Sequence, residues 1–115
     1  MLVKAKHQEA FDYFATQEYD KPKAIFKEIL KTNPKDYLSV QNIGIIDLVQ
    51  RNYEEAIKSL TVVIKVNLFT DGKSEYSRGY CYEQLGELEK AKKDYRKSRA
   101  KNSSQEMSLP VSKYE

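Results

Sequence analysis

The chain has 115 residues, a formal net charge of +3 and a hydrophobic fraction of 40%, which suits one ordinary globular domain. Its single histidine, His7, and single cysteine, Cys81, are too few for a soft-metal centre, a disulfide framework or a catalytic triad. We therefore expect a protein that is not an enzyme and that holds no metal and no cofactor.

No apolar run approaches the roughly eighteen residues that a transmembrane helix needs. The first ten residues, MLVKAKHQEA, carry charge from Lys4 onward, a pattern that predicts neither a secretory signal nor a transit peptide. A lone cysteine cannot close an internal disulfide, so the expected location is the reducing cytoplasm.

The predicted elements are helices throughout, because apolar residues recur at spacings of three and four and only four glycines and three prolines interrupt them. The helices are expected near residues 2–16, 20–32, 36–51, 54–66, 73–85 and 88–100. Asp20 is the expected N-cap of the second helix, which puts Pro22 in its first turn, where proline is tolerated. Pro34 follows the end of that helix and stops it.

Three segments of the chain follow one template, namely EYDKPKAIFKEIL, NYEEAIKSLTVVI and ELEKAKKDYRKSR. Their first apolar residues are separated by 34 and then 35 residues, and a second series of small residues has the same two spacings. The two series are Tyr19, Tyr53 and Leu88, and Ala10, Gly44 and Gly79. Two series with one period indicate an internal repeat.

A period near 34 built from two helices resembles the tetratricopeptide repeat, and the likeness covers about residues 3–101. The resemblance implies an all-α fold, a right-handed superhelix of three helix-turn-helix units in one domain over residues 1–101. The expected units lie at about 3–36, 37–71 and 72–101. Residues 102–115 have no amphipathic period and are expected to form a polar, flexible tail.

The resemblance also implies where the helices of a unit pack closely. The small residues of the pattern include Gly44, Gly79, Ala56 and Ala91, and its large apolar residues are Phe26, Leu60 and Tyr95. Asp47 departs from the pattern, because Tyr13 and Tyr82 hold the matching places in the other units.

The second helix of the middle unit and the second helix of the last unit differ in how much of their surface is polar. The helix near 54–66 is apolar nearly all round, so we expect neighbours on both sides of it. The last helix keeps only a stripe of Leu88, Ala91 and Tyr95, as the polar outer face of a terminal unit requires. A complete short array is the resulting expectation.

In the family that the chain resembles, the first helices line a concave groove that binds a peptide or a helix of a partner protein. The groove residues that this implies are Lys4, His7, Phe11, Leu38, Gln41, Asn42, Ile45, Lys73, Tyr76 and Tyr80. Phe14 and Val49 are expected to pack against neighbouring helices instead. Aromatic side chains in a concavity are common anchors, so the expected partner segment has apolar anchors, with acidic flanks that meet Lys4 and Lys73.

Three other functions remain open at this point. The chain could be a structural subunit permanently embedded in a larger assembly. It could bind the terminal carboxylate of a chaperone, since Asn42 and Lys73 match two of the five clamp positions of one subgroup, although Ser77 stands where that clamp has arginine.

The third alternative is binding of an acidic partner or of RNA by the last helix, which has six basic residues from Lys90 to Arg99. Glu89 and Asp94 lie among them and are expected to dilute their field, so a solvated end face is favoured. Cys81 is expected to be a small buried hydrophobe, and His7 an exposed polar residue.

Overall fold

The computed structural model describes residues 18–66 and 71–102, and every regular element within these ranges is an α-helix. The helices are α2 (Asp20–Thr32), α3 (Tyr37–Val49), α4 (Tyr53–Val66), α5 (Lys73–Gln84) and α6 (Leu88–Lys101). The predicted all-α fold is therefore confirmed. The helix predicted over 2–16 and the tail after Asn102 lie outside the described residues. None of the described helices is both long and apolar enough to cross a membrane.

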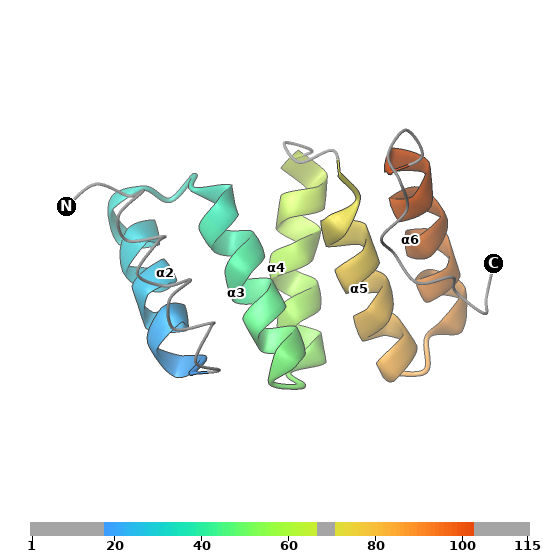
Figure 1. Ribbon diagram of the computed structural model, residues 1–115, viewed down its shortest axis with the longest axis horizontal. Helices are drawn as coiled ribbons and strands as arrows, with labels where there is room; N and C mark the ends of the chain where they lie inside the picture. Colours follow the sequence, from blue (N-terminus) through green and yellow to red (C-terminus); the bar gives the residue numbers. More distant parts are fainter. Residues whose placement is uncertain (1–17, 67–70, 103–115) are drawn as a thin grey trace.

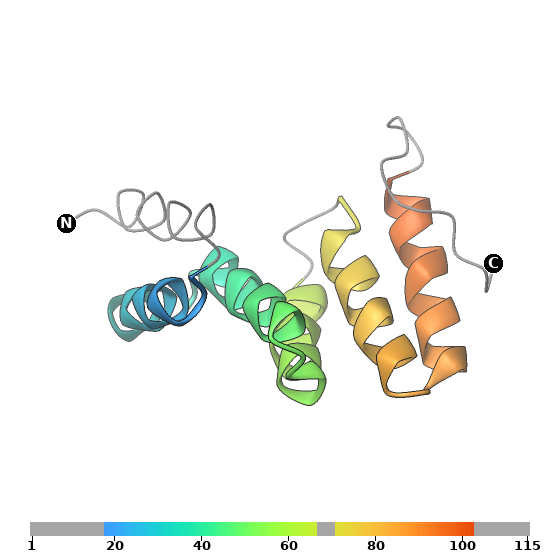
Figure 2. The same ribbon diagram turned by 60° about the horizontal axis from the view of Figure 1, so that its bottom comes forward.

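The five helices stand in a row in chain order, and each packs against the next one along the chain (Figure 1). The helix α3 also contacts α5, which follows it by two places. A second view shows α2 and α6 at the two ends of the row (Figure 2). The helices α3–α4 and α5–α6 are thus two complete hairpins, and α2 is the second helix of the unit before them.

The helix ends agree with the predicted ones to within two residues. The prediction that Asp20 is an N-cap is wrong, because α2 begins at Asp20 and Tyr19 holds the cap position without a side-chain hydrogen bond. The Asp20 carboxylate lies in the first turn, where the helix dipole favours negative charge, and accepts a 3.1 Å hydrogen bond from the Gln50 amide. Pro22 is buried in that turn, as the sequence predicts.

Small residues bring the helices of each hairpin into close contact. A Cβ atom at Gly44 would lie 3.0 Å from Leu60 Cγ, and one at Gly79 would lie 3.1 Å from Asp94 Cβ and from the Tyr95 ring. These distances are shorter than ordinary van der Waals contacts, so a larger side chain at either glycine would push against its neighbour. The predicted role of the small residues is confirmed.

The apolar core follows the row of helices. Phe26, Ile29 and Ile46 join α2 to α3, and Leu60 and Cys81 join α4 to α5, all within buried clusters. Burial of each such large apolar side chain contributes about 1.5–3 kcal/mol. The core positions that the repeat template predicts are therefore filled.

The helix α4 has neighbours on both sides, as expected, because α3 and α5 both pack against it. It is not covered all round, since Val62 and Val66 remain 46% and 37% exposed while Leu60 is fully buried. Leu88, which belongs to the predicted apolar stripe of α6, is 40% exposed at the first residue of that helix. These apolar residues stay in contact with solvent because the neighbouring helices do not cover them.

The departure at Asp47 has a structural explanation. Its side chain is 5% exposed and accepts a 2.6 Å bond from the Lys23 ammonium group of α2. The Asn52 amide lies 3.5 Å from the same carboxylate oxygen. An ion pair thus joins the first unit to the second at the place where the pattern has an aromatic residue.

The start of α5 is tied to the end of α6. Gly72 has φ +81°, a left-handed conformation, and a Cβ atom there would lie 2.5 Å from the Ser98 carbonyl oxygen, so only glycine fits. The Ser98 hydroxyl donates a 2.8 Å hydrogen bond to the Gly72 carbonyl. The third unit is closed on itself by this contact.

Candidate protein-binding face

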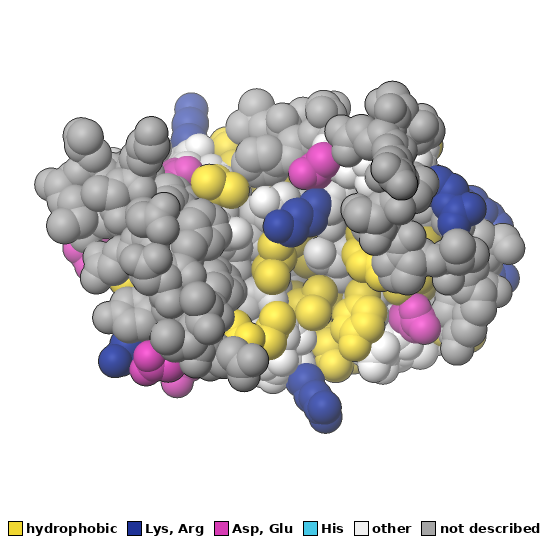
Figure 3. Space-filling view, in the orientation of Figure 1, with side chains coloured by type: hydrophobic (Ala, Val, Ile, Leu, Met, Phe, Trp, Pro, Cys, Tyr) yellow, Lys and Arg dark blue, Asp and Glu magenta, His cyan; other side chains and the backbone are white. Residues whose placement is uncertain are grey.

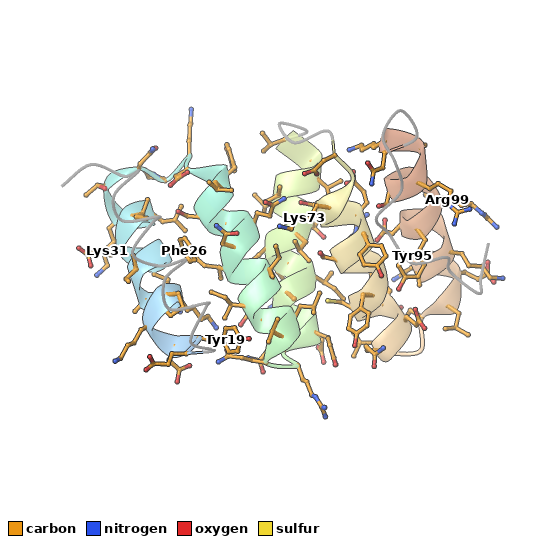
Figure 4. The ribbon with its side chains drawn as sticks, viewed as in Figure 1. Tyr19, Phe26, Lys31, Lys73, Tyr95 and Arg99 are labelled. Atoms are coloured by element: carbon orange, nitrogen blue, oxygen red, sulfur yellow. The ribbon has the colours of Figure 1, made fainter. Side chains whose placement is uncertain are left out.

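The helices α3 and α5 present one shared face, and a helical repeat explains which side chains it carries. Residues three, four, seven and eleven places apart lie on the same side of a helix. The set comprises Leu38, Asn42, Ile45 and Val49 of α3 and Lys73, Tyr76, Ser77 and Tyr80 of α5. We call this set the first-helix face. Hydrophobic side chains gather over the middle of the molecule in this view (Figure 3), and Lys73 lies above them (Figure 4).

A buried hydrogen bond holds the upper part of this face together. The Gln41 amide of α3 donates to the Ser74 hydroxyl of α5 at 2.8 Å, and both groups are buried. Asn42 and Lys73 are the chain neighbours of this bonded pair. The bond therefore fixes α3 against α5 at the seam between two units, next in sequence to one amide and one cation.

Asn42 has an unused donor. Its side chain is 5% exposed, and its Nδ2 atom has no hydrogen-bond partner within the described part of the chain. A buried donor without an acceptor costs about 1–3 kcal/mol. The Nδ2 atom is itself buried, so an acceptor from a bound molecule, such as a peptide carbonyl, would remove that cost only where the covering side chains move aside.

Lys73 contributes the cation of this face. It is exposed, and none of the described residues forms an ion pair with its ammonium group. Its backbone N–H donates to the Asp71 carboxylate at 3.0 Å, which fixes the start of α5. The long side chain therefore remains available to an acidic group in solution.

Tyrosines make up the lower part of the face. Tyr80 is 36% exposed, and its ring packs edge-on against Tyr53 with centroids 6.3 Å apart. Tyr76 is half-buried, with its ring centroid 5.4 Å from that of Tyr95. Burial, and then the charge of Glu83, raises the pKa of Tyr76 above its ordinary value, so its hydroxyl stays protonated at neutral pH. The rings are supported from behind and offer apolar area at low entropic cost.

The buried charges of the molecule are structural. Glu75 is paired with Lys101, and Asp94 with Arg78, at the α5–α6 interface. Burial raises the pKa of Cys81 to about 11, so it is an unreactive thiol, and its predicted buried position is confirmed. No group of three potential metal ligands occurs within residues 18–66 and 71–102.

The predicted groove residues fall into four groups. Lys4, His7 and Phe11, and also Phe14, lie outside the described residues. Leu38, Lys73 and Tyr80 are exposed, Ile45 and Tyr76 are half-buried, and Gln41 and Asn42 are buried. The Gln41 amide is occupied by Ser74, so it supports the face from within and presents no free group to a partner.

Two further predictions are affected by the geometry. Val49 is expected from the sequence to pack against a neighbouring helix, but it is the last residue of α3 and is 45% exposed. It follows Ile45 by four residues, and this spacing is the signal that assigns it to the first-helix face. Arg78, the residue next to the missing clamp arginine, is engaged with Asp94 of α6. The face has no guanidinium group for a terminal carboxylate at that place.

Comparison with known proteins adds three findings. The family model of the tetratricopeptide repeat matches residues 76–98, which include most of α5 and α6. No curated protein matches the chain significantly in sequence. Solved structures, in contrast, match it over most of its length.

The PcrH chain in a complex with the chaperone binding region of PopD is 18% identical, with a TM-score of 0.82, over 90% of this chain and 77% of that chain. PcrH from Pseudomonas aeruginosa is 19% identical, with a TM-score of 0.80, over 89% of this chain and 76% of that chain. A MamA chain from Desulfovibrio magneticus RS-1 is 20% identical, with a TM-score of 0.79, and this chain spans 57% of its length. The likeness shows a common helical-repeat fold.

Proposed function

Because a tetratricopeptide repeat model matches residues 76–98 and the chain has a helical-repeat fold, we propose that it is a non-enzymatic interaction module that binds a segment of another protein across the first-helix face. The observation that carries the proposal is the pairing of exposed apolar anchors with two unused polar groups. Tyr80 and Val49 offer the anchors, Asn42 offers a donor, and Lys73 offers a cation.

The chemistry of these groups indicates the kind of segment that fits. Apolar side chains of the partner pack on the tyrosines, a backbone carbonyl accepts from Asn42, and an acidic residue meets Lys73. PcrH, which shares the fold, is known in complex with a region of another protein, PopD, and this supports a protein segment as the ligand class.

Capture from an extract of the native cell, with quantitative mass spectrometry, tests the proposal. The Tyr80→Ala and Lys73→Glu variants remove one anchor and reverse one charge. The control is Val62→Ala, which truncates an apolar residue that is 46% exposed on α4, whereas Tyr80 is 36% exposed. We expect each face variant to lower the recovery of the partner about fivefold or more, equal to about 1 kcal/mol, and the control to leave it unchanged.

The helical signal and the unfolding midpoint of each variant are recorded in parallel. Lys73→Glu is informative here, because its side chain takes part in no described ion pair and is exposed. Equal recovery with both face variants and with the control would place the interface elsewhere, and the proposal would be wrong.

A further inference from the structure

The outer face of α6 carries a cluster of basic residues. Ala91, Asp94, Tyr95 and Ser98 form the buried side of this helix, which packs against α5. Lys93, Arg96, Lys97 and Ala100 lie on the opposite side and are exposed. Figure 3 shows Lys and Arg side chains gathered at this end of the molecule, and Arg99 points away from the row (Figure 4).

Six of the seven cations of α6 fall into two classes, and the seventh, Arg99, takes part in an interaction of its own. Three of them are paired with carboxylates, Lys90 with Glu87, Lys92 with Glu89, and Lys101 with Glu75. Lys93, Arg96 and Lys97 form no ion pair with any residue in the described ranges. The unpaired charges are therefore the ones that face outward at the end of the row.

Asp94 does not weaken the field of these cations, and the prediction that it does is wrong. Its carboxylate is 2% exposed and accepts two 2.7 Å hydrogen bonds from Arg78, on the inner side of the helix. Glu89 is exposed in the first turn of α6, where it is paired with Lys92 and lies one turn before Lys93. Beyond Lys93, Arg96 and Lys97 have no exposed carboxylate within one turn of them on this helix.

The residue types on this face indicate which class of anionic partner fits it better, a nucleic acid or an acidic polypeptide. Its exposed residues include no amide, hydroxyl or aromatic group, so contacts to base edges or base faces would fall to Arg96 and two lysines alone. Tyr95 is buried, and its hydroxyl donates to Glu83 at 2.7 Å. Three cations are also few for a nucleic-acid backbone, which proteins hold through about 6–10 phosphate contacts.

We propose that the outer face of α6 is a second interface, which binds an acidic polypeptide segment through Lys93, Arg96 and Lys97. Lys93 and Lys97 are about 6 Å apart along the helix axis, so the segment has closely spaced carboxylates. The absence of large apolar residues among these three cations makes the contact electrostatic. Such a contact depends on salt and affects association rates most strongly. It is independent of the first-helix face.

Fluorescence anisotropy with a short labelled polyglutamate peptide tests this inference on the full chain at low salt. The test variant combines Lys93→Glu, Arg96→Glu and Lys97→Glu. The control combines Lys27→Glu, Lys31→Glu and Lys65→Glu, three exposed lysines of α2 and α4, and has the same net charge. We expect the test variant to bind about tenfold more weakly than wild type, and the control to stay within about threefold.

Four outcomes would overturn the proposal. The first is no binding of the peptide to the wild-type chain at low salt, and the second is an equal loss in both triple variants, which would reflect net charge alone. The third is that a duplex RNA binds this face more tightly than the peptide does. The fourth is that the test variant changes the oligomeric state of the chain, which would make a second copy the occupant. Tyr80→Ala should leave peptide binding unchanged.

Discussion

Arg78 and Asp94 form a two-point ion pair between α5 and α6, in which Nε and Nη2 of the arginine each lie 2.7 Å from a carboxylate oxygen. The third nitrogen, Nη1, donates to the Thr61 hydroxyl of α4 at 3.2 Å. The hydrogen bond to Asp94 is the main cause that raises the pKa of Arg78 above its ordinary value. One permanently charged group therefore joins three helices.

The first prediction removes that cation. Arg78→Met leaves the Asp94 carboxylate buried without its partner, and we expect the free energy of unfolding to fall by about 3–5 kcal/mol. Urea unfolding at neutral pH measures the loss. The double variant Arg78→Met with Asp94→Leu should recover most of it, because no buried charge remains. In contrast, Lys58→Met at the exposed pair with Glu55 should change stability by less than about 1 kcal/mol; an equal effect at both sites would contradict the argument.

The second prediction compares two glycines with the same backbone conformation. Gly72 and Gly86 both have φ +81°, but a Cβ atom meets the Ser98 carbonyl at 2.5 Å in the first case and no atom within 4 Å in the second. Gly86→Ala should cost about 1–2 kcal/mol from the backbone alone. Gly72→Ala should cost clearly more, because the helix end at Ser98 must also move. Thermal unfolding of the two variants measures the difference, and equal costs would show that the close approach contributes nothing.

The third prediction concerns pH. The pKa of Cys81 is raised by burial from 9.0 to about 11. Between these values the unfolded chain loses the thiol proton while the folded chain keeps it, so the stability that Cys81 contributes is complete below pH 9 and is lost as the pH rises towards 11. The slope is at most about 1.4 kcal/mol per pH unit.

Unfolding of wild type and Cys81→Ala across this range isolates the contribution of the thiol. The difference in stability between the two proteins should shrink as the pH rises, and a constant difference would contradict the shift. Below pH 9 the thiol of the folded chain should react with a disulfide reagent only as fast as the chain opens.

The fourth prediction separates stability from binding at Asn42. Asn42→Leu removes the buried donor that lacks an acceptor, so we expect the free energy of unfolding to rise by about 1 kcal/mol while partner recovery falls. Gln41→Leu is the contrasting variant, because it breaks the bond to Ser74 and should lower stability. Denaturant unfolding and the capture experiment give the two readouts. An Asn42→Leu variant that binds normally would exclude this amide from the contact.

The repeat and its helices could be predicted because they depend on local pattern. The spacing of Gly44 and Gly79 follows from the close packing of two helices, which requires a small residue at one place in every unit. The end of α2 before Pro34 follows from the geometry of proline in the same way. Such constraints return at the same place in every unit, so the spacing of the residues expresses them.

The fate of the charged and polar groups could not be predicted in that way. Whether Asp94 faces solvent or Arg78 depends on how the side chains of α5 and α6 pair, and this pairing leaves no periodic signal in the sequence. Likewise, Gln41 lies at a position whose spacing predicts exposure. Its amide donates a hydrogen bond to Ser74 because α5 packs beside α3. Long-range pairing decides which charges remain free to act on a partner.

The hydrogen bond from Ser98 to Gly72 joins residues 26 places apart in the chain. Closing so short a loop costs less entropy than joining distant segments, and a unit rich in local contacts folds fast. The bond from Lys23 to Asp47 spans 24 places and the bond from Arg78 to Asp94 spans 16. Short loops therefore close along the whole row of described helices, and we expect fast folding that no single unit has to begin.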